Sequence, residues 1–259
     1  MRVHNRKAAV MAAFFSFIMS LCFITGCVST TVITAENEPM RLFSADADLY
    51  VCLNVKGNEP LVTAFLQKYE PSLTDENINA FLKYVSVFYA AKKGSNVEIA
   101  AKGKFPAAAK LIIPREKNGF EFAFLGKKLL LCSSGSTSAM IERLSENYST
   151  NYFPVSANDD MLFYVNDISA FMPQIFGTSI KFGIKAVSGA ANRDLLPGAK
   201  DTYLTDADFY LVDNRAVKAA VFVLGSIFSA EVSADENGVI HCKGIKFPRI
   251  NENGGLYEF

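Results

Sequence analysis

Short stretches of alternating residues, joined by tight turns, are the feature of this sequence that most restricts its fold. Apolar and polar residues alternate over 49–55, and two β-like stretches at 85–91 and 97–103 flank a short turn. Asn-Gly pairs at 118–119 and 237–238 mark two further turns between β-like stretches. A period of two places successive side chains on opposite faces of a strand, and Asn-Gly is typical of hairpins. The pattern therefore predicts antiparallel β-structure.

Helical patterns are interspersed with these strands. Residues 58–69 have Pro in the first turn, and residues 74–82 open with Thr-Asp-Glu, which is typical of a helix start. Residues 134–148 and 168–191 also read as helical, whereas residues 216–225 are β-like. We therefore expect an α+β fold, in which antiparallel sheets carry helices packed on one face.

The two halves of the chain share several of these features. The sequence Asp-Ala-Asp-Leu-Tyr at 46–50 is echoed by Asp-Ala-Asp-Phe-Tyr at 206–210, and each half contains an Asn-Gly turn. This similarity predicts two diverged repeats, residues 42–153 and 154–259, that share a core. The alternative is that antiparallel sheets reuse Asp and Asn-Gly at strand ends without any duplication.

The first 26 residues have the layout of a secretory signal. Arg2, Arg6 and Lys7 form a basic head, and an uncharged apolar run follows over residues 8–24. That run is shorter than the roughly 20 apolar residues that a transmembrane helix needs. The run ends in Ile24-Thr25-Gly26-Cys27, which resembles the lipobox of bacterial lipoproteins. The alternatives are an uncleaved anchor, or an ordinary signal followed by a chance cysteine.

The resemblance implies a lipidated cysteine. It implies transfer of diacylglycerol to the thiol of Cys27, cleavage after Gly26 and acylation of the new amino terminus, and two or more acyl chains hold a protein stably on a membrane. Val28 stands where Asp would favour retention at the inner membrane, so the outer membrane is preferred in an organism that has two membranes. Residues 27–41 are then expected to be a lipidated flexible tether. The chain as a whole resembles envelope lipoproteins of spirochaete type.

Composition excludes some classes of partner. Loss of the signal removes three of the 26 basic residues and none of the 26 acidic ones, so 23 basic and 26 acidic residues follow it. A nucleic-acid-binding protein usually has a basic patch or a high isoelectric point, and neither is evident from this sequence. The apolar fraction of 50% is high enough for a real core and argues against general disorder.

The cysteines and the single histidine after the signal give no pattern of a cofactor or metal site. Cys52, Cys132 and Cys242 lie beside aliphatic residues in strand-like stretches and lack the spacing of zinc ligands. We expect them to be core residues, although one disulfide between two of them stays possible on sequence alone. His241 alternates with Ile240 and Cys242, which predicts that it points to the opposite face. We expect no cofactor and no bound metal.

Two clusters of polar residues deserve a chemical interpretation. Closely spaced aspartates at 46/48, 159/160 and 206/208 could bind a cation, but they lack the ligand spacing of a helix–loop–helix calcium site and fit strand ends better. The Ser-rich segment 133–138 precedes a helix and has neither the Lys of a P-loop nor a nucleophile elbow. Capping of that helix is preferred to anion binding there. A hydrolase using Ser134 or Ser136 with His241 is the least favoured function.

The segment 168–187 is the most suggestive candidate for ligand or membrane contact. It is apolar, its only charges are Lys181 and Lys185, and Pro and Gly residues interrupt it. It could line a pocket for an acyl chain, lie on a bilayer surface, or simply cover a sheet. The candidate contact residues are Phe171, Met172, Ile175, Phe176, Ile180, Phe182 and Ile184.

The sequence thus favours a non-enzymatic, membrane-anchored envelope lipoprotein whose folded part is a binding or structural module. A carrier of a lipid or another apolar ligand, using residues 168–187, is the alternative. The expected partners are the membrane, through the N-terminal lipid on Cys27, and a protein or an apolar ligand. Nucleic acid is not expected to bind.

Overall fold

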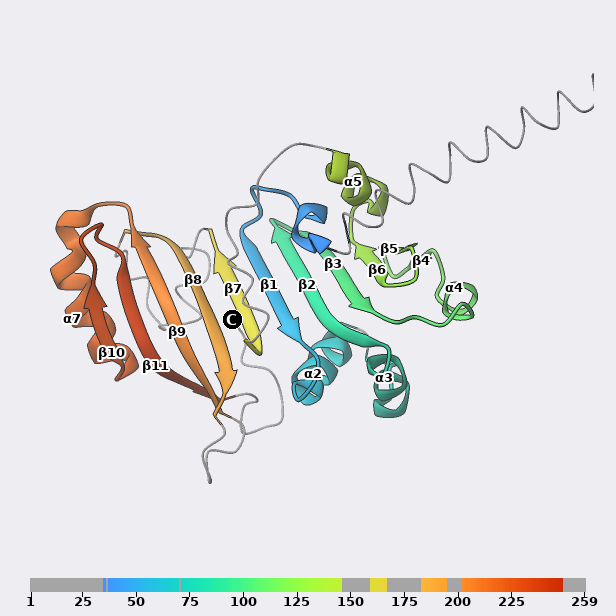
Figure 1. Cartoon of the computed structure of the whole chain (residues 1–259), viewed down its shortest axis with the longest axis horizontal. Coiled ribbons are helices and arrows are strands. Elements are labelled where there is room, and N and C mark those ends of the chain that lie inside the picture. Colours follow the sequence, from blue (N-terminus) through green and yellow to red (C-terminus); the bar gives the residue numbers. More distant parts are fainter. Residues whose placement is uncertain are drawn as a thin grey trace, which may run out of the picture.

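A single antiparallel sheet is the central element of the computed structural model. The structure describes residues 35, 37–69, 71–145, 159–166, 183–194 and 202–248. The sheet has eleven strands in the order β10-β11-β9-β8-β7-β1-β2-β3-β6-β5-β4. All of the neighbouring strands pair in antiparallel fashion. Figure 1 shows the sheet running the length of the molecule, with helices at both ends.

Along the described part of the chain, short helices separate groups of one to three strands. The strands are β1 (Leu49–Asn54), β2 (Val85–Lys93), β3 (Asn96–Gly103), β4 (Glu116–Lys117), β5 (Phe120–Leu125), β6 (Leu129–Ser133), β7 (Met161–Val165), β8 (Ile184–Arg193), β9 (Thr202–Leu211), β10 (Glu231–Ala234) and β11 (Ile240–Pro248). The helices are η1 (Pro39–Leu42), α2 (Glu59–Tyr69), α3 (Asp75–Leu82), α4 (Ala109–Ile112), α5 (Thr137–Glu142), η2 (Arg143–Ser145), η4 (Asn214–Ala216) and α7 (Val217–Phe228).

The first half of the sheet is covered on both faces. Leu131 of β6 packs with Met40 of η1 and Met140 of α5. Its neighbour Leu130, which points to the opposite face, packs with Val62 of α2 and with helix α3. The expected helices therefore lie on both faces of this half rather than on one.

Helix α7 covers the second half on the face that α2 and α3 cover in the first half. Val51 lies opposite Phe163, Phe163 opposite Gly189, and Gly189 opposite Ala207, so these residues share one face of the sheet. Ala207 belongs to the core that Ala220 and Leu224 of α7 complete.

The opposite face of the second half carries polar side chains. Tyr50, Tyr164, Ser188, Asp208 and His241 lie opposite one another in successive strands and so line a single face. Tyr50 and Tyr164, whose ring centroids are 6.2 Å apart, lie where the two halves meet. We call the part of this face formed by Ser188, Asp206, Asp208, Tyr210 and His241 the polar face.

The α+β class, the antiparallel pairing and the expected hairpins are confirmed, with differences in detail. The chain builds one continuous sheet, because β1 pairs with β7 across the boundary that we predicted between two units. Two residues of the expected tether belong to the folded part: Ala35 and Met40 are buried in the first core, with exposed fractions of 0% and 6%. The residues before Ala35 lie outside the described part of the chain.

Two local predictions are wrong: a helix forms where we expected a strand, and a strand forms where we expected a helix. Residues 217–228 form helix α7, in which Ala220, Leu224 and Phe228 recur at helical spacing and face the core. Residues 184–193 form strand β8, so the expected helix over 168–191 cannot continue beyond residue 183. Both segments are short and apolar, and apolar runs of that length suit a buried strand and a buried helix equally well.

The internal duplication stays a prediction. Outward from the middle of the sheet, the first half follows the order β1-β2-β3-β6-β5 and the second half follows β7-β8-β9-β11-β10. The residues that suggested the repeat do not occupy equivalent places, however. Asp46 and Asp48 precede β1, the first strand of its half, whereas Asp206 and Asp208 lie inside β9, the third. The strand order supports the duplication better than the motif does.

Candidate functional site

Most of the predicted contact residues lie outside the described part of the chain. Cys27, Phe171, Met172, Ile175, Phe176, Ile180 and Phe182 all belong to the residues that the structure does not describe. Ile184 is described: it begins β8, is 9% exposed, and packs in the core that α7 covers. Ile184 is therefore a core residue and has little surface to offer a ligand or a membrane.

The three described cysteines are free thiols, in agreement with the expectation that they are core residues rather than a disulfide pair. Cys52 and Cys242 are buried and Cys132 is partly buried. Burial raises the pKa of Cys52 to about 11, that of Cys132 to about 12 and that of Cys242 to about 11. Thiols of this kind are almost entirely protonated at neutral pH and are poor nucleophiles.

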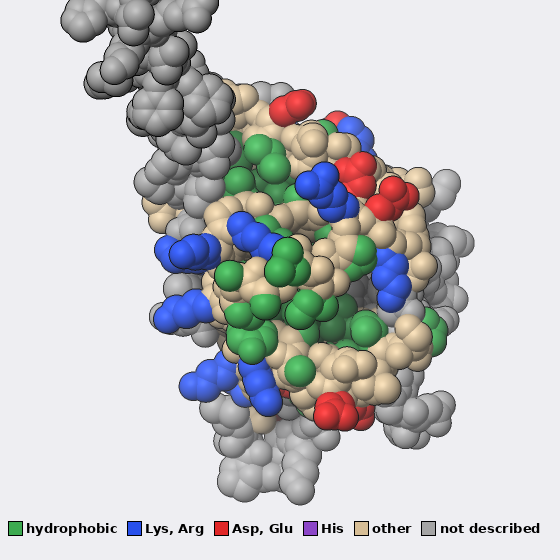
Figure 2. All heavy atoms as spheres, turned by 90° about the vertical axis from the view of Figure 1, so that its right-hand side faces the viewer, with side chains coloured by type: hydrophobic (Ala, Val, Ile, Leu, Met, Phe, Trp, Pro, Cys, Tyr) green, Lys and Arg blue, Asp and Glu red, His purple; other side chains and the backbone are tan. Residues whose placement is uncertain are grey.

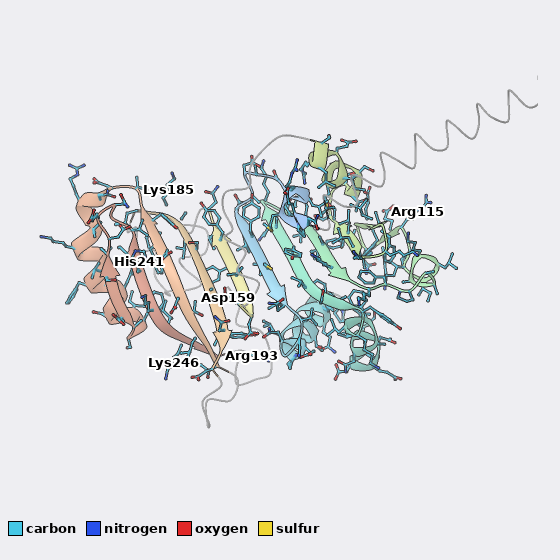
Figure 3. All side chains as sticks on the ribbon, viewed as in Figure 1. Arg115, Asp159, Lys185, Arg193, His241 and Lys246 are labelled. Carbon is cyan, nitrogen blue, oxygen red and sulfur yellow. The ribbon has the colours of Figure 1, made fainter. Side chains whose placement is uncertain are left out.

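The serines proposed for a hydrolase lie far from the histidine. The side chain of Ser136 accepts a hydrogen bond from the backbone N–H of Ala139, so it caps α5 as expected. Ser134 follows β6, whereas His241 lies in β11, and six strands separate β6 from β11. Seven spacings of about 4.8 Å amount to about 34 Å. Figure 3 places His241 at the end of the molecule opposite Arg115. Ser134, Ser136 and His241 cannot form one catalytic group within a chain.

The first pair of aspartates braces a turn. Asp46 accepts hydrogen bonds from Lys93 Nζ and Ser44 Oγ, each at 2.5 Å, and these two contacts hold the pKa of Asp46 below its usual value. Asp48 accepts a hydrogen bond from the backbone N–H of Gly94 at 2.7 Å. Both carboxylates thus fasten the β2–β3 turn to the start of β1. Among the residues that the structure describes, no group of three His, Cys, Asp or Glu side chains could hold a metal ion.

His241 forms a small charged cluster on the polar face, on the side opposite Ile240 and Cys242, as predicted. Its Nδ1 lies 2.6 Å from Asp208 Oδ1, and its Nε2 lies 3.9 Å from Asp235 Oδ2. The backbone N–H of Val239 donates to Asp235, and so do the side chain and backbone N–H of Asn237. These hydrogen bonds, with a smaller contribution from the nearby His241, lower the pKa of Asp235. The cluster ties β9 and β11 to the β10–β11 turn, and a third of the imidazole stays open to solvent, with 35% of the side chain exposed.

A buried polar cluster joins the two halves where β1 and β8 end and β7 begins. Asn58, which is 0% exposed, accepts a hydrogen bond from the hydroxyl of Tyr203 and donates to the backbone carbonyl of Asn54 at 2.8 Å. Asn54 Nδ2 donates in turn to the backbone carbonyl of Asp159 at 2.5 Å. We call these four residues, with Asp160, Asn192 and Arg193, the junction cluster. Figure 3 shows Asp159 and Arg193 on this side of the sheet.

Asp160 is the charged centre of the junction cluster. The backbone N–H and the Nε of Arg193 donate to Asp160 Oδ2 at 2.8 and 2.9 Å. Burial acts to raise the pKa of Asp160, but the hydrogen bonds and charge of Arg193 outweigh burial, and the net pKa is lowered. The adjacent chain is tightly packed as well, because a Cβ at Gly57 would come within 1.6 Å of the Arg193 side chain. The cluster is therefore a rigid structural join.

Sequence reasoning missed most of the junction cluster. Asn58 and the Asp159–Asp160 pair were noticed only as a helix start and as strand-end residues, and Arg193 and Tyr203 carried no signal at all. These side chains meet only when β8 and β9 lie beside β7. A pattern within a single segment does not reveal such a contact.

A polar pocket of about 160 Å³ opens beside η2 and the β2–β3 turn. At its wall Arg143 Nη1 donates to both carboxylate oxygens of Glu98 at 2.9 Å, and also to the backbone carbonyl of Leu42. Glu98 is 4% exposed, so this ion pair is buried. Lys92 and Lys93 line the same pocket. Of the charges at its wall, Glu98 and Arg143 pair with each other, and Lys93 pairs with Asp46.

No helix in the described part of the chain is long and apolar enough to cross a membrane. No protein-family model matches the chain, and no curated protein matches its sequence. Among solved structures, the chain is similar to TP0453, a protein of the spirochaete Treponema. Crystal form I of TP0453 matches with a TM-score of 0.62 at 14% identity, over 82% of this chain and 93% of TP0453. Crystal form III matches with a TM-score of 0.60 at 13% identity, over 81% and 93% of the two chains. The chain therefore shares the fold of TP0453.

Proposed function

We propose that this chain is a non-enzymatic lipoprotein of a bacterial cell envelope, held to a membrane through lipid on Cys27. Its folded part serves as a binding or structural module. The observation that carries the proposal is the lipobox Ile24-Thr25-Gly26-Cys27 behind a basic head and an uncharged apolar run. Because Val28 follows the cysteine, the proposed address is the outer membrane in preference to the inner one.

The fold supports this proposal in two ways. Ala35 is fully buried in the first core, so the folded part begins only eight residues after Cys27. This layout suits an anchored domain that stays close to the membrane. TP0453, which shares the fold, is a protein of the spirochaete Treponema, in keeping with the resemblance to spirochaete lipoproteins. The wide separation of Ser134 and Ser136 from His241 removes the one arrangement of nucleophile and base that the sequence suggested.

The carrier hypothesis depends on residues 168–187. Of that range the structure describes only residues 183–187, in which Ile184 and Val187 pack in the core beneath α7. The remainder lies outside the described residues, so a wall for an acyl chain stays a prediction. It predicts that lipid extracted with the purified protein is lost when Phe171 and Phe176 are both replaced by Asp.

Metabolic labelling with a palmitate analogue tests the anchor. The wild-type chain should carry the label and should partition into the detergent phase with membranes. The Cys27→Ala variant should lose both properties, while Cys22→Ala, which alters a cysteine inside the signal, should keep them. Persistent labelling of Cys27→Ala would overturn the proposal.

A further inference from the structure

An exposed apolar helix surrounded by basic residues projects from one end of the molecule. Helix α4 has no buried residue and no side-chain cap, and Leu111 and Ile112 are 90% and 77% exposed. The neighbouring β4–β5 turn is open too, since a Cβ at Gly119 would meet nothing within 4 Å. We call residues 104–128 the basic tip. Figure 1 shows α4 at the end of the molecule farthest from α7.

The charge of the basic tip is opposite to that of the remaining chain. It contains six basic residues and two acidic ones, Glu116 and Glu121. Of the 23 basic and 26 acidic residues that follow the signal, the rest of the chain thus keeps 17 basic and 24 acidic ones. The basic residues are Lys104, Lys110, Arg115, Lys117, Lys127 and Lys128.

One of these positive charges borders the apolar surface directly. The Nζ of Lys110 lies 5.9 Å from the centroid of the Phe124 ring. Glu121 is engaged elsewhere, because its carboxylate accepts a hydrogen bond from the backbone N–H of Thr137 at 2.9 Å. Figure 2, which looks onto this end, shows hydrophobic side chains gathered together, with lysine and arginine side chains around them and acidic side chains at the top and bottom of the view.

The length of chain before the core limits how far this end can be from the anchor. Seven residues separate Cys27 from Ala35, and a chain extends by at most about 3.5 Å per residue, so about 28 Å is the longest possible reach. Ala35 packs in the same core as Leu125, which lies within the basic tip, and Leu129, which follows it. A lipid on Cys27 therefore holds the half of the molecule that carries the tip close to the bilayer.

We propose that the basic tip docks on the surface of an anionic phospholipid bilayer, with Leu111 and Ile112 entering the headgroup region and the lysines contacting lipid phosphates. The proposal rests on the proposed anchor only for its cellular setting. An apolar protrusion ringed by Lys and Arg has the chemistry of an interfacial membrane contact. The docked tip would fix the orientation of the sheet relative to the membrane.

Vesicle sedimentation tests this proposal without the lipid anchor. The protein is the complete mature chain from residue 27 carrying Cys27→Ser, so neither the acyl groups nor the apolar signal contributes. The vesicles contain phosphatidylcholine alone or phosphatidylcholine with phosphatidylglycerol. The chain should bind the anionic vesicles and not the neutral ones. Binding should fall steeply between about 0.1 M and about 1 M salt, because the Debye length shortens from about 10 Å to about 3 Å.

Matched variants locate the contact. Leu111→Ser with Ile112→Ser should weaken binding at least about tenfold, and each of Lys110→Gln and Lys117→Gln about fivefold. Phe222→Ser is the control, because Phe222 is a 76% exposed apolar residue of helix α7 outside the tip. All of these residues are exposed, so circular dichroism and melting temperature should not change.

Either of two results would overturn the proposal: no binding of the Cys27→Ser chain to anionic vesicles, or equal loss of binding in the tip variants and in Phe222→Ser. A failure of the proposed anchor is distinguishable from both. It would show as an unlabelled Cys27 in cells, and it would leave the vesicle experiment unaffected.

Discussion

The hydrogen bond from Tyr203 to Asn58 should be a measurable part of the join between the two halves of the sheet. Tyr203 is 4% exposed and Asn58 is 0% exposed. The substitution Tyr203→Phe keeps the ring and removes the hydroxyl, which leaves the buried amide oxygen of Asn58 without this donor. A buried polar group left unsatisfied costs about 1–3 kcal/mol. We expect the free energy of unfolding to fall by about 2 kcal/mol.

Urea denaturation measures this loss. With an m-value of about 2 kcal/mol per molar urea, the midpoint should fall by about 1 M while the m-value stays constant. Tyr210→Phe is the matched control: its hydroxyl lies 3.3 Å from Ser188 Oγ on the partly exposed polar face, where water can replace it. That variant should change stability by no more than about 0.5 kcal/mol.

A double-mutant cycle isolates the contact itself. In an Asn58→Ala background the acceptor is absent, so adding Tyr203→Phe should cost little further stability. If Tyr203→Phe costs the same in both backgrounds, or no more than Tyr210→Phe in the wild type, the reasoning about the junction cluster is wrong.

Three further predictions follow from the fold and its electrostatics. Leu224→Ala should lower the free energy of unfolding by about 2–5 kcal/mol because it opens a cavity beneath α7. Phe222→Ala, on the exposed side of the same helix, should change the free energy of unfolding by less than about 0.5 kcal/mol. Equal effects of the two substitutions in thermal melts would refute the orientation of α7. Because the pKa of Asp160 is lowered in the folded chain, its stabilising effect is complete above the unfolded pKa, near 3.8, and is lost as the pH falls through the folded pKa. Asp160→Asn should therefore make stability less dependent on pH in acid, and an unchanged acid limb in a pH series of urea melts would contradict this. The three core cysteines should react with a thiol reagent at neutral pH only after unfolding, and rapid modification of the native chain would show that they are accessible.

Much of the fold could be predicted because it is encoded locally. The hairpin β10–β11 carries Asn237-Gly238 at its turn, and Gly238 has a φ of +80°, a conformation that glycine adopts without strain. Thr74 caps α3 by accepting from the backbone N–H of Asn77, as its sequence indicated. Each of these signals lies within a few residues and does not depend on the remaining chain.

Features that depend on distant residues could not be predicted. The joining of the halves through β1 and β7 required knowledge of which strands become neighbours, and the helix over residues 217–228 was missed because its apolar residues suit either structure. The basic tip escaped notice for a related reason: its charges are spread over 25 residues and gather only when β4 and β5 fold back beside α4. Of the predicted site, Cys27 and the residues 171–182 lie outside the described part of the chain.

The mass of the mature protein extracted from membranes tests the central proposal most directly. We expect a chain that lacks residues 1–26 and begins at Cys27, with an N-terminal peptide that carries diacylglycerol on the thiol and an acyl group on the amine. Treatment with alkali, which cleaves the ester-linked chains, should lower that mass in discrete steps. A protein that begins at Met1, or an unmodified Cys27 in the membrane-bound fraction, would contradict the proposal that this chain is a lipid-anchored envelope protein.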